Sequence, residues 1–364
     1  MPFDKINVLI VDDSAFMRKA IENMIAKDPM INVVGHARNG KEAIEKIAEL
    51  DPDVVTLDIE MPVMDGMEAL KIIMRDYPRP VIVVSHLTTE GAKITLDALE
   101  LGAVDFITKD KTYASFGILK IEEDLVAKIK YFGRRRHKAK LSRKPAPAEN
   151  EEVKTIKKET TIVAEEEKKV SAVAIEIVGI GTSTGGPQAL QRVISKLPND
   201  IGVPILVVQH MPPKFTKSLA DRLNMLSKLS VVEAQGKEKL EENVVYIAKG
   251  GYHMKVRKVG PHYYTELTNE PRDLLYIPSV DVLFTSIANN YEGNSLGVIM
   301  TGMGKDGLLG AKLLKQKGGA MIAQDEDSCV IYGMPKAVVE SKLADRVVSL
   351  DKIAEEIVKY CAFN

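Results

Sequence analysis

A serine in a glycine-rich stretch is the first candidate for chemistry in this chain. Residues 175–186 read IEIVGIGTSTGG, an apolar run that ends in a G-x-S-x-G pattern centred on Ser183. Leu190, Val193 and Ile194 then recur at helical spacing, so the pattern predicts a strand, a sharp turn and a helix. A serine at the tip of such a turn has an exposed hydroxyl, and the helix N-terminus beside it favours developing negative charge.

Two other interpretations of the same stretch remain open. Gly179 and Gly181 also begin a GxG pattern typical of dinucleotide-binding loops, which usually have an acidic residue about 20 residues further on. The next apolar run, 204–208, instead ends in Gln209 and His210. The alternative without chemistry is a glycine-rich turn that carries a solvated serine.

His210 and Asp306 each follow an apolar run, as Ser183 does. Parallel strands end at one edge of a sheet, so these three distant residues can meet there. A serine needs a base to become nucleophilic, and a histidine needs an acceptor that fixes its tautomer and supports its charge. The order Ser, His, Asp differs from that of α/β-hydrolases, so the turn does not imply that fold. His253 and His262 are rival bases, and a structural role is the common alternative for a histidine at a strand end.

The backbone near the predicted triad offers donors for a developing oxyanion. The apolar run 296–300 leads into a Gly-Met-Gly turn at residues 302–304. Backbone N–H groups of this turn, together with the N–H of Thr184, would form an oxyanion hole. The stretch 175–186 and the turn therefore predict acyl-transfer chemistry.

A second set of polar residues lies near the N-terminus. Asp12 and Asp13 follow one apolar run, Asp58 follows another, and Ser85 and Lys109 follow two more. Three carboxylates at one sheet edge repel each other and need a cation, for which Mg²⁺ is suited. Such a cation would neutralise an incoming phosphoryl group while a carboxylate attacks phosphorus. The alternative is a flavodoxin-like sheet in which these acids are only cap and turn residues.

Alternating strands and helices must position both sets of residues. In residues 1–132, strand-like runs at 8–11, 32–37, 54–58, 80–85 and 105–109 alternate with helical patterns, and a last helix runs from about 121 to 132. Residues 173–364 repeat the alternation, with a hairpin near residues 253–268 and a final helix at 353–361. We therefore predict an α/β protein of two doubly wound parallel-sheet domains.

Residues 133–172 differ from both halves, because basic, Pro/Ala-rich and acidic stretches leave few apolar residues for a core. This composition predicts a polar linker between domains 1–132 and 173–364. Residues 134–136 are all arginine, and a nucleic-acid patch is the alternative to a solvated basic segment.

Overall composition narrows the function class. The 364 residues have a formal net charge of -1 and are 45% apolar, which argues against a general nucleic-acid or lipid-surface binder. Two cysteines without metal-ligand spacing favour a reducing compartment. No signal-peptide pattern and no run of about 18 apolar residues is present, so we expect a cytoplasmic protein with no direct membrane insertion.

Residues 1–132 resemble the receiver domain of response regulators, with a spacing that holds across the whole half. The stretch LDIEMPVMDG contains Asp58, which matches the phosphoacceptor. The resemblance implies a flavodoxin-like fold and the following further roles: Asp12, Asp13, Asp58 and the backbone carbonyl of Glu60 as Mg²⁺ ligands, Ser85 as the switch hydroxyl, Phe106 as the switch aromatic and Lys109 as the phosphate-binding lysine.

Residues 173–364 resemble the catalytic domain of the chemotaxis protein-glutamate methylesterases. The matching stretches are GTSTGG around Ser183, QHMPPKFT with His210, LGVIMTGMGKDG with Asp306, IPSVDVLFTS and IAQDEDSCVIYGMP. The resemblance implies Met303 as an oxyanion donor beside Thr184. Thr182 and Lys249 stand where alanine and proline are usual in the family, and neither change removes a catalytic group.

Together the two resemblances imply a phosphorylation-activated serine hydrolase that demethylates glutamate methyl esters and deamidates glutamines. They also imply chemoreceptors as substrates, a CheA-type histidine kinase as phosphodonor, and no cofactor for the esterase. The alternative from another class is a receiver-coupled binding module or phosphate sink without catalysis. A phospho-regulated DNA binder lacks a basic recognition helix in this sequence.

Overall fold

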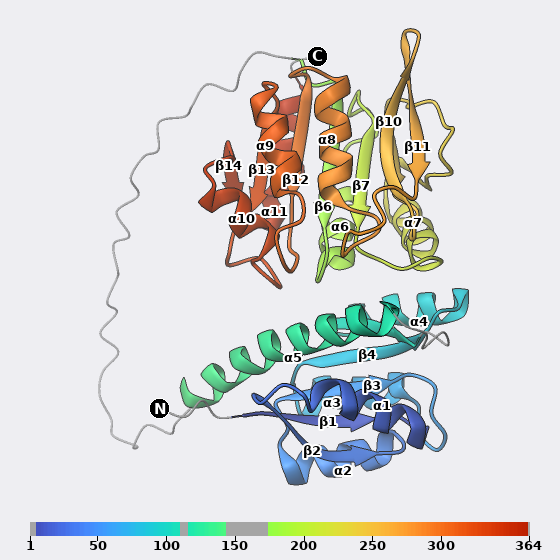
Figure 1. Ribbon diagram of the computed structural model, residues 1–364, viewed down its shortest axis with the longest axis vertical. Coiled ribbons are helices and arrows are strands. Elements are labelled where there is room, and N and C mark those ends of the chain that lie inside the picture. The colour runs from blue at the N-terminus through green and yellow to red at the C-terminus, as the bar shows by residue number, and fades with distance from the viewer. Residues whose placement is uncertain (1–4, 110–115, 143–173, 363–364) are drawn as a thin grey trace.

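The computed structural model describes residues 5–109, 116–142 and 174–362. These residues form an N-terminal and a C-terminal α/β domain, each built on a parallel sheet (Figure 1). The prediction of two doubly wound domains is confirmed. Within the described ranges, no helix combines the length and apolarity that a membrane crossing requires.

The N-terminal domain has a five-stranded sheet in the order β2-β1-β3-β4-β5, with every pair parallel. Because successive side chains of a buried parallel strand face helices on both sides, such strands are nearly all apolar, as in VVTLD of β3. The elements are β1 Ile6–Val11, α1 Ala15–Ile25, β2 Ile31–Ala37, α2 Gly40–Leu50, β3 Val54–Asp58, α3 Gly66–Asp76, β4 Val81–His86, α4 Thr89–Glu100, β5 Asp105–Lys109 and α5 Phe116–Ser142.

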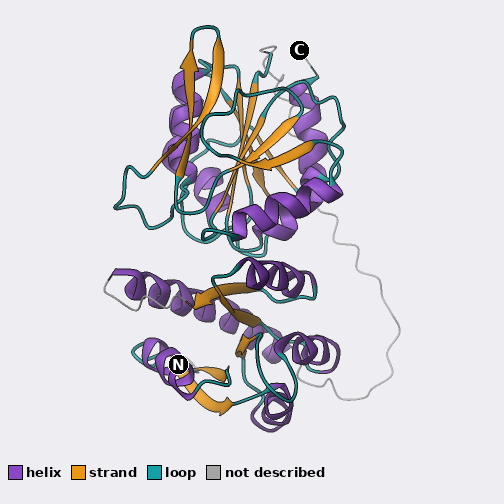
Figure 2. Ribbon diagram, turned by 90° about the vertical axis from the view of Figure 1, so that its right-hand side faces the viewer, coloured by secondary structure: helices purple, strands orange, loops and turns teal. Residues whose placement is uncertain are grey.

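The C-terminal domain has a seven-stranded parallel sheet in the order β14-β13-β12-β6-β7-β9-β8, with helices on both faces (Figure 2). The hairpin β10-β11 forms a separate antiparallel pair. The elements are β6 Ile177–Thr182, α6 Gly186–Ile194, β7 Ile205–Gln209, α7 Phe215–Leu226, β8 Ser230–Glu233, β9 Val244–Ile247, β10 His253–Val259, β11 His262–Thr268, α8 Val280–Asn290, β12 Ser295–Ile299, α9 Leu308–Gln316, β13 Ala320–Gln324, α10 Met334–Glu340, β14 Arg346–Val348 and α11 Leu350–Cys361.

Helix α5 is longer than the sequence pattern predicts. It continues to Ser142, past the boundary placed at residue 133. Arg136 is anchored there, since it bonds Asp51 at 2.9 Å and the Pro78 carbonyl at 2.8 Å, while Arg134 and Arg135 are exposed. These contacts hold the extension to the N-terminal domain. The rest of the predicted linker, residues 143–172, lies outside the described residues.

Helices α4 and α5 of the N-terminal domain face the C-terminal domain (Figure 1), and Phe106 of β5 stacks on Phe215 of α7. At the α4 end, Arg222 of α7 pairs with Asp97 at 2.6 Å and with Glu100 at 2.9 Å. At the α5 end, the hydroxyl of Tyr131 donates to the carbonyl of Val330 at 3.1 Å. The contact therefore spans the whole α4-β5-α5 face.

Candidate functional site

Three adjacent strands of the seven-stranded sheet position the predicted triad. β6 lies between β7 and β12. Ser183 follows β6 directly and His210 follows β7 directly, while Asp306 ends the loop that leaves β12. Because these strands are parallel, all three residues reach the same edge of the sheet, where ligands bind in open α/β folds.

Backbone contacts fix the turn that carries Ser183. Its N–H donates to the Thr301 carbonyl at 3.0 Å, and its carbonyl accepts from Gly186 N–H at 2.8 Å. Gly185 has a φ of +77°, a conformation that favours glycine. The backbone of Gly302 passes so close that a Cβ there would lie 2.8 Å from the Ser183 Cβ. The turn thus brings the 302–304 segment against the serine.

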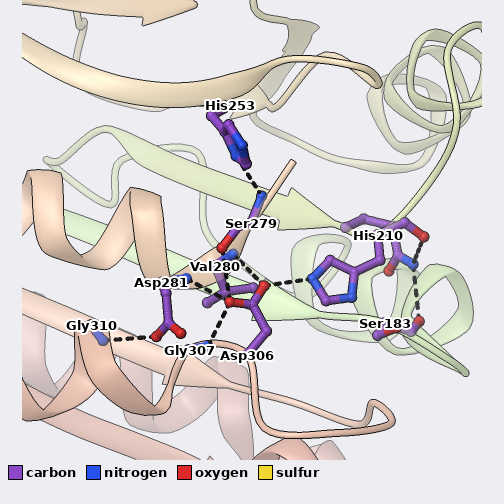
Figure 3. Close-up of polar contacts among 10 residues, drawn as sticks. Ser183, His210, His253, Ser279, Val280, Asp281, Asp306, Gly307 and Gly310 are labelled. Atoms are coloured by element: carbon purple, nitrogen blue, oxygen red, sulfur yellow. Dashed lines mark hydrogen bonds and ion pairs between the residues drawn. The ribbon is translucent and has the colours of Figure 1, made fainter. Parts of the chain in front are cut away.

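His210 is paired with Asp306 on one edge of its ring. Its Nε2 lies 2.7 Å from Asp306 Oδ2, and its side chain is only 5% exposed. The other ring nitrogen, Nδ1, is buried and has no hydrogen-bond partner among the described residues. Figure 3 shows this nitrogen on the side of the ring that faces Ser183. The arrangement leaves Nδ1 available to accept the serine proton.

Asp306 is held by donors from the start of α8 (Figure 3). Ser279 Oγ donates to Oδ1 at 2.8 Å, Val280 N–H to Oδ2 at 2.7 Å and Asp281 N–H to Oδ1 at 3.0 Å. Burial alone would raise the pKa of Asp306, but the bond from His210 and these N–H groups lower it well below its usual range. The carboxylate is therefore ionised and oriented by a helix N-terminus.

The sequence patterns above predict no helix for residues 280–290, so the role of α8 in holding Asp306 is not among the expectations. The signal was present: Ser279 is a typical N-cap residue, and Asp281 lies in the first turn. The apolar side chains that follow, Val280, Leu283 and Ile287, have helical spacing and are buried. A serine cap followed by such a run predicts a helix start.

The two rival histidines are placed away from Ser183. His253 is fully buried, with Nδ1 accepting from Ser279 N–H at 3.1 Å and Nε2 lying 2.9 Å from the Pro271 carbonyl. Burial lowers the pKa of His253. His262 begins β11 and is exposed. Of these three histidines, His210 alone lines the cavity that Ser183 lines.

The predicted oxyanion donors lie on two segments that meet at Ser183. Thr184 follows the serine directly, and Met303 belongs to the segment that Gly302 packs against it. Within the described ranges, neither backbone N–H donates to another protein group. Neither N–H is used within the described part of the protein, as an oxyanion donor requires.

Ser183 and His210 open onto a cavity of about 230 Å³ whose far wall belongs to the N-terminal domain. That wall includes Phe106, Asp124 and Lys128. The side chain next to Ser183 is bound across the cavity, since Thr184 Oγ1 donates to Asp105 Oδ2 at 2.6 Å. In this arrangement Ser183 is only 7% exposed, and the N-terminal domain covers part of its cavity.

The acidic cluster of the N-terminal domain lies at the carboxyl ends of β1 and β3. One carboxylate oxygen from each of Asp12, Asp13 and Asp58 lies within 4.8 Å of the others. Lys109 Nζ lies 2.6 Å from Asp58 Oδ2 and 2.9 Å from Asp12 Oδ2. Burial, opposed by Lys109, raises the pKa of Asp58 to about 6. Oxygen donors at this spacing fit a hard divalent cation such as Mg²⁺, which would favour the ionised form.

The two predicted switch residues make their contacts with groups outside the acidic cluster. Ser85 Oγ donates to the Gly91 carbonyl at 3.2 Å. Phe106 stacks on Phe215 of the C-terminal domain, with ring centroids 4.9 Å apart. Glu60, predicted to offer its carbonyl to the metal, is tied to the cluster by its N–H, 3.3 Å from Asp58 Oδ1.

Comparisons with known proteins agree with both halves of this description. The family model described as CheB methylesterase matches residues 178–357, and that of the response regulator receiver domain matches residues 8–115. The chain is 48% identical to the protein-glutamate methylesterase/protein-glutamine glutaminase 1 of Oleidesulfovibrio alaskensis, over 97% of this chain and 98% of that protein. It is 43% identical to the protein-glutamate methylesterase/protein-glutamine glutaminase of Pyrococcus horikoshii, over 98% of this chain and 93% of that protein.

One solved structure covers the C-terminal domain. The crystal structure of the Thermotoga maritima CheB methylesterase catalytic domain covers 51% of this chain and 99% of its own, with 43% sequence identity and a TM-score of 0.50. The similarity thus extends from sequence to fold.

Proposed function

The chain belongs to the CheB methylesterase family and carries a response regulator receiver domain, and we propose that Ser183, His210 and Asp306 carry out its esterase reaction. The substrates are glutamate methyl esters, and glutamines, of chemoreceptors. The observation that carries the assignment is the His210–Asp306 pair, whose second ring nitrogen faces Ser183 at the wall of one cavity. Both activities are acyl transfers at a side-chain carbonyl, so one site serves both.

The first half-reaction transfers the acyl group to the enzyme. His210 Nδ1 takes the proton of Ser183 Oγ as that oxygen bonds to the ester carbonyl carbon. The N–H groups of Thr184 and Met303 bind the resulting oxyanion. The imidazolium then returns the proton to the departing methoxy oxygen, and methanol leaves.

The second half-reaction restores the serine. Water gives one proton to Nδ1 while its oxygen bonds to the acyl carbon, and that proton then passes to Ser183 Oγ as the C–Oγ bond breaks. The glutamic acid side chain that is released loses the second water proton to solvent and becomes a carboxylate. In the glutamine reaction, ammonia leaves in place of methanol. Asp306 stabilises the imidazolium in both halves, because its hydrogen bonds from α8 keep it ionised.

Both activities are measurable on one receptor preparation. We expect the phosphorylated chain to release methanol from methylated sites and ammonia from sites that carry glutamine. A phosphorylated chain that releases neither would contradict the proposed function.

In the N-terminal domain, Asp58 accepts a phosphoryl group from a CheA-type histidine kinase. Mg²⁺ held by Asp12, Asp13, Asp58 and the Glu60 carbonyl would neutralise charge on the incoming phosphoryl group. Lys109, between Asp12 and Asp58, supplies a fixed positive charge for its oxygens. The spacing of the carboxylates and of Lys109 supports this assignment.

Replacing Asp58 with alanine is expected to abolish phosphorylation. With a small radiolabelled phosphodonor and Mg²⁺, the wild-type chain should be labelled and Asp58→Ala should not. EDTA should block labelling of the wild type, because uncompensated carboxylates repel the donor. Asp13→Asn is the matched comparison, since it removes a predicted Mg²⁺ ligand and keeps Asp58, the phosphoryl acceptor. Wild-type labelling of Asp58→Ala would refute the site.

The N-terminal domain restrains the esterase by covering it, and phosphorylation weakens that cover. Phe106 connects the phosphorylation site to the interface between the domains. It lies on β5, near the sheet edge that carries Asp58 and Lys109, and it stacks on Phe215 of the esterase domain. The carboxylate of its neighbour Asp105 accepts a hydrogen bond from Thr184 Oγ1. The same carboxylate forms an ion pair with Lys128, whose Nζ lies 3.1 Å from Asp105 Oδ2. If Ser85 and Phe106 turn inward toward the phosphoryl group, the stack of Phe106 on Phe215 and the adjacent Thr184–Asp105 bond are lost together.

Replacing Phe106 with leucine should therefore raise the activity of the unphosphorylated chain. An aromatic pair contributes about 0.5–1.5 kcal/mol beyond its area, which predicts a rise of about 2- to 10-fold in initial methanol release. The rate after phosphorylation should equal that of the wild type, because the open state lacks the stack. Leu101→Ala, an exposed change on the same domain, serves as the control. An unphosphorylated Phe106→Leu chain slower than the wild type would show that the stack promotes activity.

A further inference from the structure

A tyrosine outside the predicted triad lies flat against the catalytic histidine. Tyr276, in the loop between β11 and α8, is stacked on His210 with ring centroids 4.0 Å apart and planes 10° apart. It lines the same cavity as Ser183. Neither the sequence motifs nor the reaction described above use this residue.

The bond to Asp306 does not by itself fix the plane of the His210 ring. It anchors the ring at one atom, Nε2, and Nδ1 has no partner among the described residues. A ring held at one edge can still turn about that contact, and a turn carries Nδ1 away from Ser183. A face-to-face neighbour removes this freedom, because rotation would force the two rings to collide.

We propose that Tyr276 is a positioning residue for His210, whose ring keeps Nδ1 aimed at Ser183 and whose electron-rich face stabilises the imidazolium formed during catalysis. The second effect follows from the quadrupole of an aromatic ring, which attracts a cation over its face. The proposal rests on the proposed role of His210 as the general base. It adds a face contact to the edge contact that Asp306 supplies.

The ring, rather than the hydroxyl, carries this role. Within the described ranges the Tyr276 hydroxyl forms no hydrogen bond with a protein group, so it does not hold the ring in place. Burial raises the pKa of Tyr276 to about 12, and the nearby charge of Asp124 adds to that effect. The phenol therefore stays protonated at neutral pH and is unsuited to act as a base.

Two substitutions in the full-length, phosphorylated chain separate the ring from the rest of the side chain. Tyr276→Phe keeps the stack and should stay within about twofold of the wild-type kcat, whereas Tyr276→Leu loses it and should lower kcat about 10- to 100-fold with little change in KM. Tyr264→Leu, the same change on the β10-β11 hairpin away from the cavity, should leave both constants unchanged.

A spectroscopic measurement tests the stack independently of turnover. The ring protons of His210, assigned by comparison with His210→Gln, should be shifted upfield by the ring current in the wild type and in Tyr276→Phe. They should move downfield in Tyr276→Leu. A merely structural role would lower the melting temperature without this pattern, in which phenylalanine rescues both the shift and kcat.

Four results would overturn the proposal. A Tyr276→Leu chain with wild-type kcat would show that the stack is dispensable, and one with raised KM and unchanged kcat would make Tyr276 a substrate contact. A Tyr276→Phe chain as slow as Tyr276→Leu would assign the effect to the hydroxyl. If His210→Gln itself retained activity, the assignment of the base would fail, and the positioning role with it.

Discussion

Ser183→Ala is expected to lower methanol release by roughly four to six orders of magnitude, since loss of a triad nucleophile typically has effects of this size. The other hydroxyl of this turn in the cavity lining, that of Thr184, is bound to Asp105 Oδ2. The measurement is the release of radiolabelled methanol from methylated receptor membranes by the phosphorylated chain. The melting temperature should be close to that of the wild type, because Ser183 contacts its neighbours through its backbone.

The matched control is Ser195→Ala, which changes a serine at the end of α6, outside the Ser183 cavity. It should retain wild-type turnover. A Ser183→Ala chain that keeps more than about a tenth of that turnover would exclude Ser183 as the nucleophile.

Asp306→Asn has the second-largest expected effect, a loss of about 10⁴ in kcat. An amide in this place cannot stabilise the imidazolium by charge. It would also turn its NH₂ group toward either His210 or the donors at the start of α8, which bond both oxygens of the carboxylate. The measurement is the same methanol release, with substrate concentration varied so that kcat and KM are separated.

Asp325→Asn provides the comparison for that substitution. Asp325 follows the neighbouring strand β13 and caps the turn at Ser328, where its Oδ1 accepts the Ser328 N–H at 3.0 Å. Its loss should leave kcat within a few-fold of the wild type. If Asp306→Asn were nearly normal and Asp325→Asn severely impaired, the partner of His210 would be Asp325.

The predictable part of this protein is what parallel strands dictate. Apolar runs that end in Ser183, His210 or Asp58 place polar residues at one sheet edge, so both candidate sites follow from strand pattern and motif spacing. The fold class and the family were predictable for the same reason, because each motif adjoins its strand in the sequence.

The parts that escaped prediction depend on contacts between distant segments. The stack of Tyr276 on His210 joins a loop to a strand end, and no local pattern marks it. The bond from Thr184 to Asp105 crosses the domain boundary. Helix α8 was missed for a different reason: its run VDVLFTS is apolar enough to match strand and helix alike until the Ser279 cap is weighed.

The extension of α5 also depends on contacts between distant segments. Residues 133–142 are too polar for a core and were placed in the linker. The long arginine side chains there bind Asp51, Pro78 and Val330 instead. Composition predicts whether a segment can bury apolar area, but it does not show which carbonyls lie within reach of an arginine.

The most direct test of this account is the initial rate of methanol release by the full-length chain, measured before and after phosphorylation of Asp58. Moving a mostly closed population to a mostly open one takes a few kcal/mol, which predicts a rise of at least about tenfold. Asp58→Ala should stay at the low rate with or without phosphodonor. A wild-type chain that is equally fast in both states would contradict the claim that the receiver domain covers Ser183 and that phosphorylation uncovers it.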